Sequence, residues 1–277
     1  MEETCMISTY TSKLKQLQIG DLIAKIPIIQ GGMGVGISRS HLAGAVAKEG
    51  GVGIISTAQI GYDEEGFEND QPGCNLKAIK KHIRKAKELA CGNGLVGVNI
   101  MVALKHYKEH VQAAVAAGAD VIISGAGLPM NLPELVSRTC RTKIAPIVSS
   151  KRATQLILKM WAHRYDRTAD FIVVEGPKAG GHLGFTEDEA ENLTQEAYDE
   201  EIRRIIAEVK TYADKYQQDI PVVTAGGIYG REDVKHSFLL GADGVQVATR
   251  FVTTWECDAP MSYKQAYLDA GQEDIVI

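Results

Sequence analysis

A histidine that follows small residues is the strongest candidate for chemistry in this chain. His182 comes after Ala179, Gly180 and Gly181, in a loop that follows an apolar run ending at Glu175. The ordinary pKa of histidine is about 6.5, so its side chain can accept or hold a proton at neutral pH. Isolated histidines are more often structural or without a role, but a loop of this kind favours an acid–base group at His182.

Glycines after another apolar run predict a surface for a flat ligand. Residues 31–36 contain four glycines and directly follow the run Ile26–Gln30. Without side chains at Gly31 and Gly32, a ligand can come into van der Waals contact with the backbone. Met33 would then form a soft wall against a ring system. A tight loop that binds nothing is the alternative interpretation.

Two further junctions have the composition of a phosphate site. The paired Gly226 and Gly227 follow one apolar run, and Ala248 and Thr249 follow the next. Backbone N–H groups that converge after the last two strands of a barrel bind phosphate in this way. Arg250 would add positive charge there or pair with a nearby acid.

A polar amide interrupts the otherwise apolar run Val96–Ile100. This residue is Asn99, and an amide that is buried without a partner costs about 1–3 kcal/mol. We therefore expect Asn99 to hydrogen-bond either to backbone groups or to the edge of a heteroaromatic ligand.

The elements that must position these residues alternate along the chain. Short runs are apolar at consecutive positions, as in parallel strands that are buried on both faces, and segments of helical spacing separate them. The predicted strands are Ile26–Gln30, Val52–Ser56, Val96–Ile100, Val121–Ser124, Ile144–Val148, Phe171–Glu175, Pro221–Ala225 and Gly244–Val247. The predicted helices include His41–Glu49, Leu76–Cys91, Tyr107–Ala117, Lys151–Arg164, Gln195–Tyr216, Arg231–Leu240 and Tyr263–Ala270.

This alternation predicts an α/β fold, a TIM-like barrel that spans residues 1–277 as one domain. Five of the seven intervals between strand starts are 23 to 27 residues long, which is the length of one βα unit. The two longer intervals hold extra segments around Gln59–Gly73 and Gly184–Thr194, each after a strand. The ligand face should therefore lie at the carboxyl ends of the strands. A doubly wound open sheet is the alternative.

Composition and charge exclude several classes of protein. The net charge of −5 gives no overall attraction to nucleic acid or to an anionic membrane. The longest stretch without a charged residue, Leu89–Leu104, is interrupted by glycines and is too short for a membrane span. Five scattered cysteines and an amino terminus without a signal-peptide pattern predict a cytoplasmic location.

Three short motifs are discounted. The string Gly92-x-Gly94-x-x-Gly97 precedes a predicted strand instead of following one, so it does not form a dinucleotide-binding loop. The string His106-x-x-Glu109-His110 has the spacing of a zinc site, but no further ligand is evident. The glycosylation sequon at residues 192–194 has no secretory route.

Taken together, the glycine-rich and polar segments resemble the nitronate monooxygenase family, formerly called 2-nitropropane dioxygenases. That family is similar throughout to the FMN-dependent enoyl-acyl-carrier-protein reductases of type II. The resemblance runs from Pro27 to Ile277 and implies a TIM barrel that holds FMN non-covalently. The segments that carry it are Gln30–Met33, Gly97–Met101, Ala179–His182, Ala225–Ile228 and Gln246–Phe251.

The resemblance also assigns roles to single residues. His182 corresponds to the catalytic histidine of the family, and Asn99 would hydrogen-bond the edge of the flavin ring. Ala248 stands where relatives often have glycine, and its N–H remains available to a phosphate if its φ is negative. The phosphate would lie on Gly226, Gly227, Gln246 and Thr249. The residues implied to bind the cofactor are Gly31, Gly32, Met33, Asn99, Glu175, Gly180, Gly181, Gly226, Gly227, Gln246, Val247, Ala248 and Thr249.

The activity that the resemblance implies is oxidation of alkyl nitronates with O2 to a carbonyl compound and nitrite. The alternative is NAD(P)H-dependent reduction of an enoyl thioester, with His182 as proton donor. A flavin- or phosphate-binding barrel without turnover is a third reading. The expected partners are a nitronate, a nitroalkane or an enoyl thioester, with O2 and, for the alternative, NAD(P)H. A homodimer is left open. Because relatives continue past Ile277, we expect the native chain to be longer.

Overall fold

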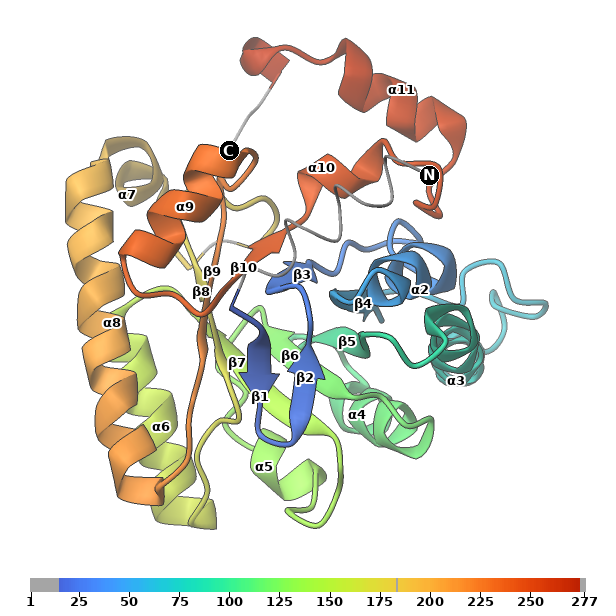
Figure 1. The fold of residues 1–277 in the computed structure, drawn as a ribbon. Helices are drawn as coiled ribbons and strands as arrows, with labels where there is room; N and C mark the ends of the chain where they lie inside the picture. Colours follow the sequence, from blue (N-terminus) through green and yellow to red (C-terminus); the bar gives the residue numbers. More distant parts are fainter. Residues whose placement is uncertain (1–14, 183, 275–277) are drawn as a thin grey trace, which may run out of the picture.

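Eight parallel strands close into a ring in the computed structural model, which describes residues 15–182 and 184–274 (Figure 1). The order around the ring is β10-β3-β4-β5-β6-β7-β8-β9. Each neighbouring pair of these strands is parallel. The predicted TIM barrel is therefore confirmed, and the closed ring excludes the doubly wound open sheet.

The barrel strands begin within two residues of their predicted starts. Their apolar runs were recognisable because a parallel strand is covered by side chains inside the ring and by helices outside it. The strands are β3 (Ile28–Gln30), β4 (Val52–Ser56), β5 (Leu95–Met101), β6 (Val121–Gly125), β7 (Lys143–Val148), β8 (Ile172–Glu175), β9 (Val222–Ala225) and β10 (Gly244–Val247).

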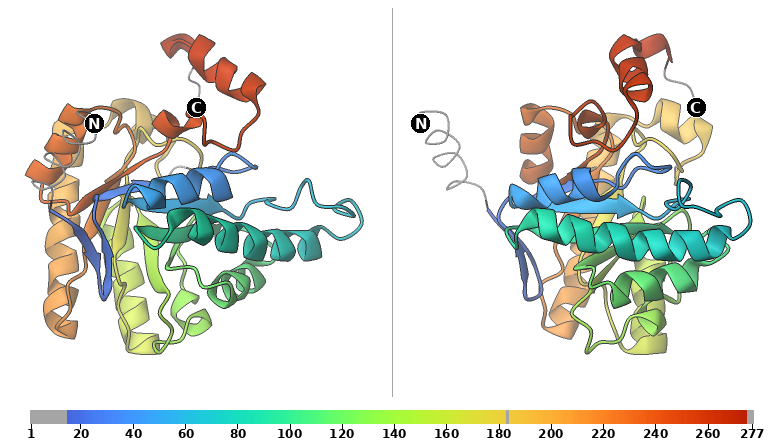
Figure 2. Two further views of the ribbon diagram at one scale, coloured as in Figure 1. Left: turned by 45° about the vertical axis from the view of Figure 1, so that its right-hand side comes forward. Right: turned by 90° about the vertical axis from the view of Figure 1, so that its right-hand side faces the viewer.

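Helices cover the outside of the barrel, and α11 stands away from it at one end (Figure 2). The seven predicted helices are all present, and the short α5 and α7 were not predicted. The helices are α2 (Ser40–Lys48), α3 (Gln71–Ala90), α4 (Tyr107–Ala116), α5 (Leu132–Leu135), α6 (Lys151–Tyr165), α7 (Glu187–Asn192), α8 (Gln195–Tyr216), α9 (Arg231–Leu239), α10 (Thr249–Val252), α11 (Met261–Asp269) and the 3-10 turn Gln272–Asp274.

Helix α3 begins five residues before its predicted start at Leu76. Its first residue is Gln71, because the carboxylate of Asp70 accepts a hydrogen bond from the N–H of Gly73 at 2.9 Å and so caps the helix. The prediction had assigned the residues up to Gly73 to an added segment before the helix, yet proline is well tolerated at this end of a helix.

The added segment around Gly184–Thr194 is also partly helical. Thr186 and Glu189 form a capping box at the start of α7, in which each side chain bonds a backbone N–H of the other residue. This reciprocal pair organises a segment in which no helix was predicted.

A hairpin closes the amino ends of the barrel strands. Strands β1 (Leu17–Ile19) and β2 (Leu22–Ala24) pair antiparallel, and their apolar side chains pack with those that fill the barrel interior. Lys143, the first residue of β7, forms an ion pair of 2.5 Å with Asp21 in the hairpin turn. The hairpin was not predicted, because each strand has only three residues.

Successive residues of each strand alternate between two separate cores. In β8, Val173 packs with the cluster inside the ring, whereas Ile172 and Val174 pack with the cluster between strands and helices. This period of two determines which polar residues at the strand ends point into the barrel.

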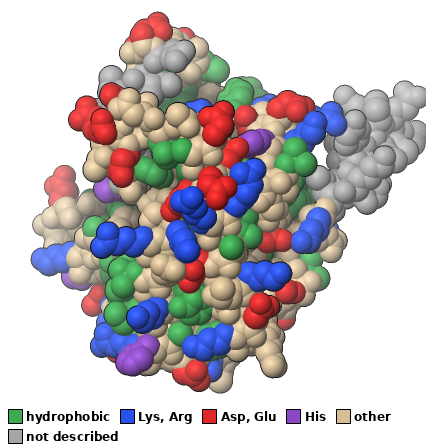
Figure 3. Space-filling model, turned by 90° about the vertical axis from the view of Figure 1, so that its left-hand side faces the viewer, with side chains coloured by type: hydrophobic (Ala, Val, Ile, Leu, Met, Phe, Trp, Pro, Cys, Tyr) green, Lys and Arg blue, Asp and Glu red, His purple; other side chains and the backbone are tan. Residues whose placement is uncertain are grey.

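The outer face that α8 presents is mixed in charge. Figure 3 shows acidic and basic side chains interspersed on this side of the molecule, and Glu200 pairs with Arg204 along α8 at 3.4 Å. In the portion of the chain with described coordinates, no helix has both the length and the hydropathy needed to cross a membrane. Ile277, past which we expect the native chain to continue, lies outside the described ranges.

Candidate active site at the carboxyl ends of the barrel strands

Three polar side chains point into the barrel where its strands end. Asn99 in β5, Glu175 in β8 and Gln246 in β10 occupy inward positions, because the residue two places earlier in each strand lies in the barrel interior. Within the described residues none of the three side chains has a hydrogen-bond partner, and the Oε1 atom of Gln246 is fully buried. The strand ends therefore present polar groups that the protein itself does not satisfy.

Bare backbone lies between two of these side chains. A Cβ atom on Gly32 would be 2.5 Å from the Cβ of Asn99, and one on Gly31 would be 3.2 Å from the Cγ of Gln246. The first distance excludes any side chain at Gly32 without movement of the neighbour. The N–H of Gly31 donates to the carbonyl of Val247 at 2.9 Å, which holds this backbone against β10. The structure thus brings five predicted site residues together.

The carboxyl group of Glu175 titrates near neutrality. Desolvation by burial disfavours its charged form and raises its pKa from 4.5 to about 7. At neutral pH the carboxyl is therefore present in both forms and can either donate or accept a hydrogen bond.

The predicted phosphate loop has two successive glycines in the left-handed region. Gly226 and Gly227 have φ values of +91° and +72°, which other residues rarely adopt. A Cβ on Gly226 would lie 3.0 Å from the N atom of Ala179, and one on Gly227 would lie 2.9 Å from the Cβ of Lys178. The loops after β8 and β9 therefore pack directly on each other.

The segment after β10 leads into α10 through Ala248. Its φ is −121°. Because this φ is negative, the N–H of Ala248 remains available to a phosphate. Thr249 is exposed at the start of α10. Arg250 donates from Nη1 to the carbonyl of Tyr229 at 2.8 Å, and its guanidinium lies 4.9 Å from the centroid of that ring. Arg250 is thus held by an aromatic residue instead of by an acid.

Met33 packs as a core residue on one side. It is half-buried, and its N–H donates to the hydroxyl of Ser38 at 2.8 Å. Its neighbours form a small apolar cluster between the first loop and the segment after α10, composed of Ile37, Leu42, Val252, Cys257 and Ala259. The cluster holds Met33 on one side, and its predicted contact with a ring system stays a prediction.

The loop that carries His182 lies at the surface. Gly180, Gly181 and His182 are exposed, and no atom lies within 4 Å of a Cβ built on either glycine. The hydroxyl of Ser149 donates to the carbonyl of Gly184 at 3.2 Å and ties the loop to the end of β7. Among the described residues, no hydrogen bond or ion pair joins His182 to the three inward polar side chains. Its catalytic role therefore stays a prediction.

Two residues beside the glycines had no predicted role. Lys178 packs against Gly227 and places a positive charge next to the paired glycines. Ser56 ends β4, and its hydroxyl would be 3.3 Å from a Cβ on Gly34. Both could have been found by the signal that identified Asn99. That signal is a polar side chain at or just after the end of a strand.

The structure disfavours both the dinucleotide-binding reading of the glycine string and the zinc-site reading of the histidine string. Gly92 and Gly94 precede β5, and Gly97 lies inside it, so no helix amino terminus follows this string. His110 is buried in α4, where desolvation lowers its pKa to about 4. In the described ranges, no group of three or more potential metal ligands occurs.

The sequence pattern that defines the nitronate monooxygenases matches residues 16–277. This chain belongs to the nitronate monooxygenase family. It is therefore an oxidoreductase of that family, and the resemblance stated from the sequence is confirmed.

Individual relatives are distant but match along most of the chain. The probable nitronate monooxygenase of Staphylococcus saprophyticus is 26% identical over an alignment of 285 positions, which covers 96% of this chain and 76% of that protein. The probable nitronate monooxygenase of Bacillus subtilis is 26% identical over an alignment of 266 positions. This alignment covers 90% of this chain and 72% of that protein. The structure of FabK from Thermotoga maritima superposes with a TM-score of 0.67 at 26% identity and covers 91% of this chain and 67% of that one.

A nitroalkane oxidase from Streptomyces ansochromogenes shares the fold. Its TM-score is 0.65 at 20% sequence identity, with 87% of this chain and 70% of that chain covered. At this identity the likeness supports the barrel architecture only.

Proposed function

We propose that this protein is an FMN-dependent enzyme that oxidises alkyl nitronates with O2 to a carbonyl compound and nitrite. The observation that supports it most is the set of polar side chains around the bare backbone of Gly31 and Gly32. These side chains, Asn99, Glu175 and Gln246, have no hydrogen-bond partner among the residues that the structure describes. A flat heteroaromatic ring with a polar edge would satisfy these groups. Membership of the nitronate monooxygenase family supports the choice of substrate.

The residues at the strand ends fit FMN. No donor in the described part of the chain bonds the buried Oε1 of Gln246, and the close approach of Gly32 to Asn99 leaves the backbone at Gly32 without room for a side chain. The N–H groups of Gly226, Gly227 and Thr249 are proposed to hold the phosphate. The remaining proposed cofactor contacts are Met33, Glu175, Gly180, Gly181, Val247 and Ala248, with Lys178 added for its charge beside Gly227.

Bound FMN would supply the redox chemistry between the nitronate and O2. The other tasks fall to the chain. An unprotonated imidazole nitrogen of His182 would accept the α-carbon proton of a neutral nitroalkane and so form the nitronate in place. Glu175, with its pKa near 7, would donate a hydrogen bond in its neutral form. Because His182 is exposed, we expect it to act when its loop approaches the barrel mouth.

The test is an anaerobic flavin-reduction experiment on the purified protein. We expect a flavin absorbance spectrum that is bleached by propionate-3-nitronate and restored by O2, with nitrite as a product. Bleaching by NAD(P)H, followed by reoxidation with a crotonyl thioester, would instead select enoyl thioester reduction. A flavin that responds to neither substrate would leave a binding barrel without turnover. A protein that cannot be loaded with FMN would refute all three readings.

The role of His182 is tested separately by His182→Ala. We expect turnover of neutral nitroalkane to fall by about 100-fold or more, the usual contribution of a general base. Turnover of preformed nitronate should fall less, because no proton has to be removed. His163→Ala, which changes another exposed histidine on α6, is the matched control. Equal nitroalkane turnover in both variants would remove His182 from the mechanism.

A further inference from the structure

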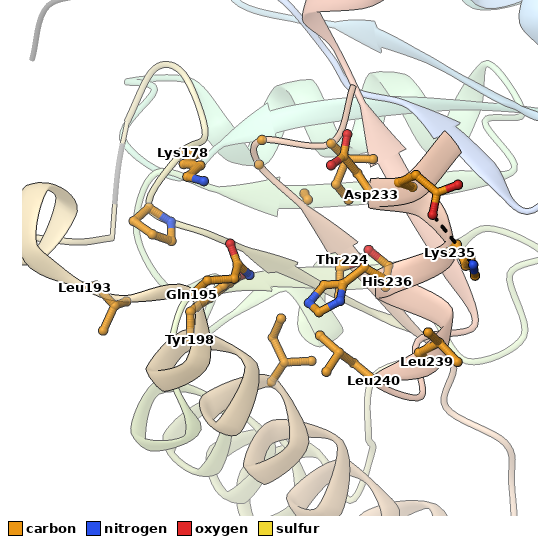
Figure 4. Close-up of a pocket in the computed structure, with 18 of the residues that line it drawn as sticks. Lys178, Leu193, Gln195, Tyr198, Thr224, Asp233, Lys235, His236, Leu239 and Leu240 are labelled. Atoms are coloured by element: carbon orange, nitrogen blue, oxygen red, sulfur yellow. Dashed lines mark ion pairs between the residues drawn. The ribbon is translucent and has the colours of Figure 1, made fainter. Parts of the chain in front are cut away.

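A pocket lies in the helix layer, outside the barrel. It has a volume of about 510 Å³ and lies between α8 and α9, over the end of β9 (Figure 4). Thr224 faces it from the outer side of β9, because Val223 and Ala225 belong to the barrel interior. The pocket is therefore separate from the barrel mouth, although Gly226 and Gly227 border it.

Two hydroxyl groups in its wall are buried without partners. Tyr198 on α8 and Thr224 are 8% and 3% exposed, and among the described residues neither hydroxyl has a hydrogen-bond partner. A Cβ on Gly176 would be 2.7 Å from the Oη of Tyr198, so the phenol lies over the end of β8, the strand that pairs with β9. Native structures rarely leave such groups unsatisfied. Because both oxygens are almost inaccessible to solvent, a ligand in the pocket would bond them after these side chains rotate toward it.

The charged side chains at the opening are balanced in sign, and they include Lys178 and Asp233 as well as two pairs. Asp199 accepts a hydrogen bond from the Nε2 of Gln195 at 2.8 Å and forms an ion pair of 2.9 Å with His236. Glu232 and Lys235 form another ion pair at 3.6 Å. Acidic and basic groups thus offset each other around the opening, which disfavours a ligand with a net charge.

The rest of the pocket is largely apolar. Figure 4 shows Leu193 and Tyr198 on the α8 side of the space and Leu239 and Leu240 on the α9 side. Its volume falls within the range of small-molecule sites, about 300–1,000 Å³. Burial also raises the pKa of Tyr198, so its hydroxyl keeps its proton and remains a donor.

We propose that this pocket binds a neutral, mainly apolar small molecule through a carbonyl oxygen that accepts hydrogen bonds from the hydroxyls of Tyr198 and Thr224. A carbonyl is the simplest group that two hydroxyl donors can bond at once, since its oxygen has two lone pairs. The balanced charges account for the neutrality of the ligand, and the leucine-lined sides account for its apolar body. The pocket shares Gly226 and Gly227 with the proposed phosphate loop, but the two hydroxyls that would bind the carbonyl have no proposed role in FMN binding or in nitronate oxidation.

Benzophenone is a suitable probe because it is a neutral diaryl ketone that attaches to nearby C–H bonds under near-ultraviolet light. We expect the purified protein to be labelled mainly in residues 193–202 and 232–240, as mapped by peptide mass spectrometry. Labelling spread evenly over the surface, or no labelling at all, would mean that the pocket holds only solvent and would overturn the proposal.

Two competitors test the hydrogen bonds on the unaltered protein. Acetophenone and α-methylstyrene have nearly the same shape, but the second carries a CH2 group in place of the carbonyl oxygen. We expect acetophenone to protect against labelling at a concentration about tenfold lower, the usual effect of a buried hydrogen bond that is left unmade. Equal protection by the two compounds would contradict recognition through the carbonyl.

The two hydroxyls are tested by a variant that changes little in volume. Tyr198→Phe combined with Thr224→Val should reduce benzophenone labelling of these segments by about tenfold. Tyr212→Phe removes a hydroxyl from the same helix away from the pocket, and its labelling should equal that of the unaltered chain. Unchanged labelling in the double variant would also overturn the proposal.

Discussion

Replacing Glu175 by glutamine should stabilise the folded chain at alkaline pH. Burial raises the pKa of this carboxyl from 4.5 to about 7, so the folded state disfavours the charged form. Below pH 4.5 the carboxyl is protonated in both the folded and the unfolded chain and costs nothing. As pH rises from 4.5 to 7, the unfolded chain releases the proton while the folded chain retains it. The folded state therefore loses stability across this window, and the loss is complete above it.

The size of the effect follows from the width of that window. Each pKa unit corresponds to about 1.4 kcal/mol, so a shift from 4.5 to about 7 costs about 3 kcal/mol at pH 8. Glutamine has nearly the same shape and no charge to desolvate. We expect Glu175→Gln to exceed the original chain in free energy of unfolding by about 2–3 kcal/mol at pH 8, and by much less at pH 4.5.

Urea denaturation at a series of pH values measures this difference. The comparison needs matched ligand content, because a ligand that binds only the folded chain adds its own stabilisation. Glu256→Gln changes an exposed carboxylate after α10 and should give no pH-dependent difference of this size. A constant difference between Glu175→Gln and the original chain from pH 4.5 to 8 would refute the reasoning.

Three further substitutions test the packing that forms the site. Gly32→Val should prevent loading with FMN, because even its Cβ would lie 2.5 Å from that of Asn99. Loading is measured by flavin absorbance after dialysis, and retained loading would show that the backbone around Gly32 can move. Gly53→Ala should destabilise the chain by about 3 kcal/mol or more in urea denaturation, since its Cβ would overlap the carbonyl of Ala43 in α2. Thr186→Ala should cost about 1 kcal/mol of stability in the same assay, by removing the capping box of α7; no loss would mean that α7 forms without its cap.

The barrel was predictable from the sequence because its strands are apolar on both faces. Runs such as Val52–Ser56 need no partner residue to be recognised, and helical spacing between them fixes the alternation. The hairpin Leu17–Ala24 carries too few residues per strand to give the same signal. Its stability comes from contacts with the barrel interior, which no local pattern describes.

The candidate site was predictable in its residues but not in their directions. A strand that is apolar on both faces has no alternation of polarity, so the sequence does not show that Asn99 and Glu175 point inward. Whether a described residue bonds the Oε1 of Gln246 depends on residues far away in the chain. The separation of α8 from α9, which opens the outer pocket, depends on how two helices rest on the barrel.

The position of the hairpin at the amino ends of the strands suggests how the protein can be attached to a surface. Ile23 on β2 is 48% exposed, and the hairpin lies at the end of the barrel opposite to Asn99 and Gln246. A tether at Ile23 would therefore point the barrel mouth toward the solution. Immobilised in this orientation, the protein would leave the candidate site open to reagents.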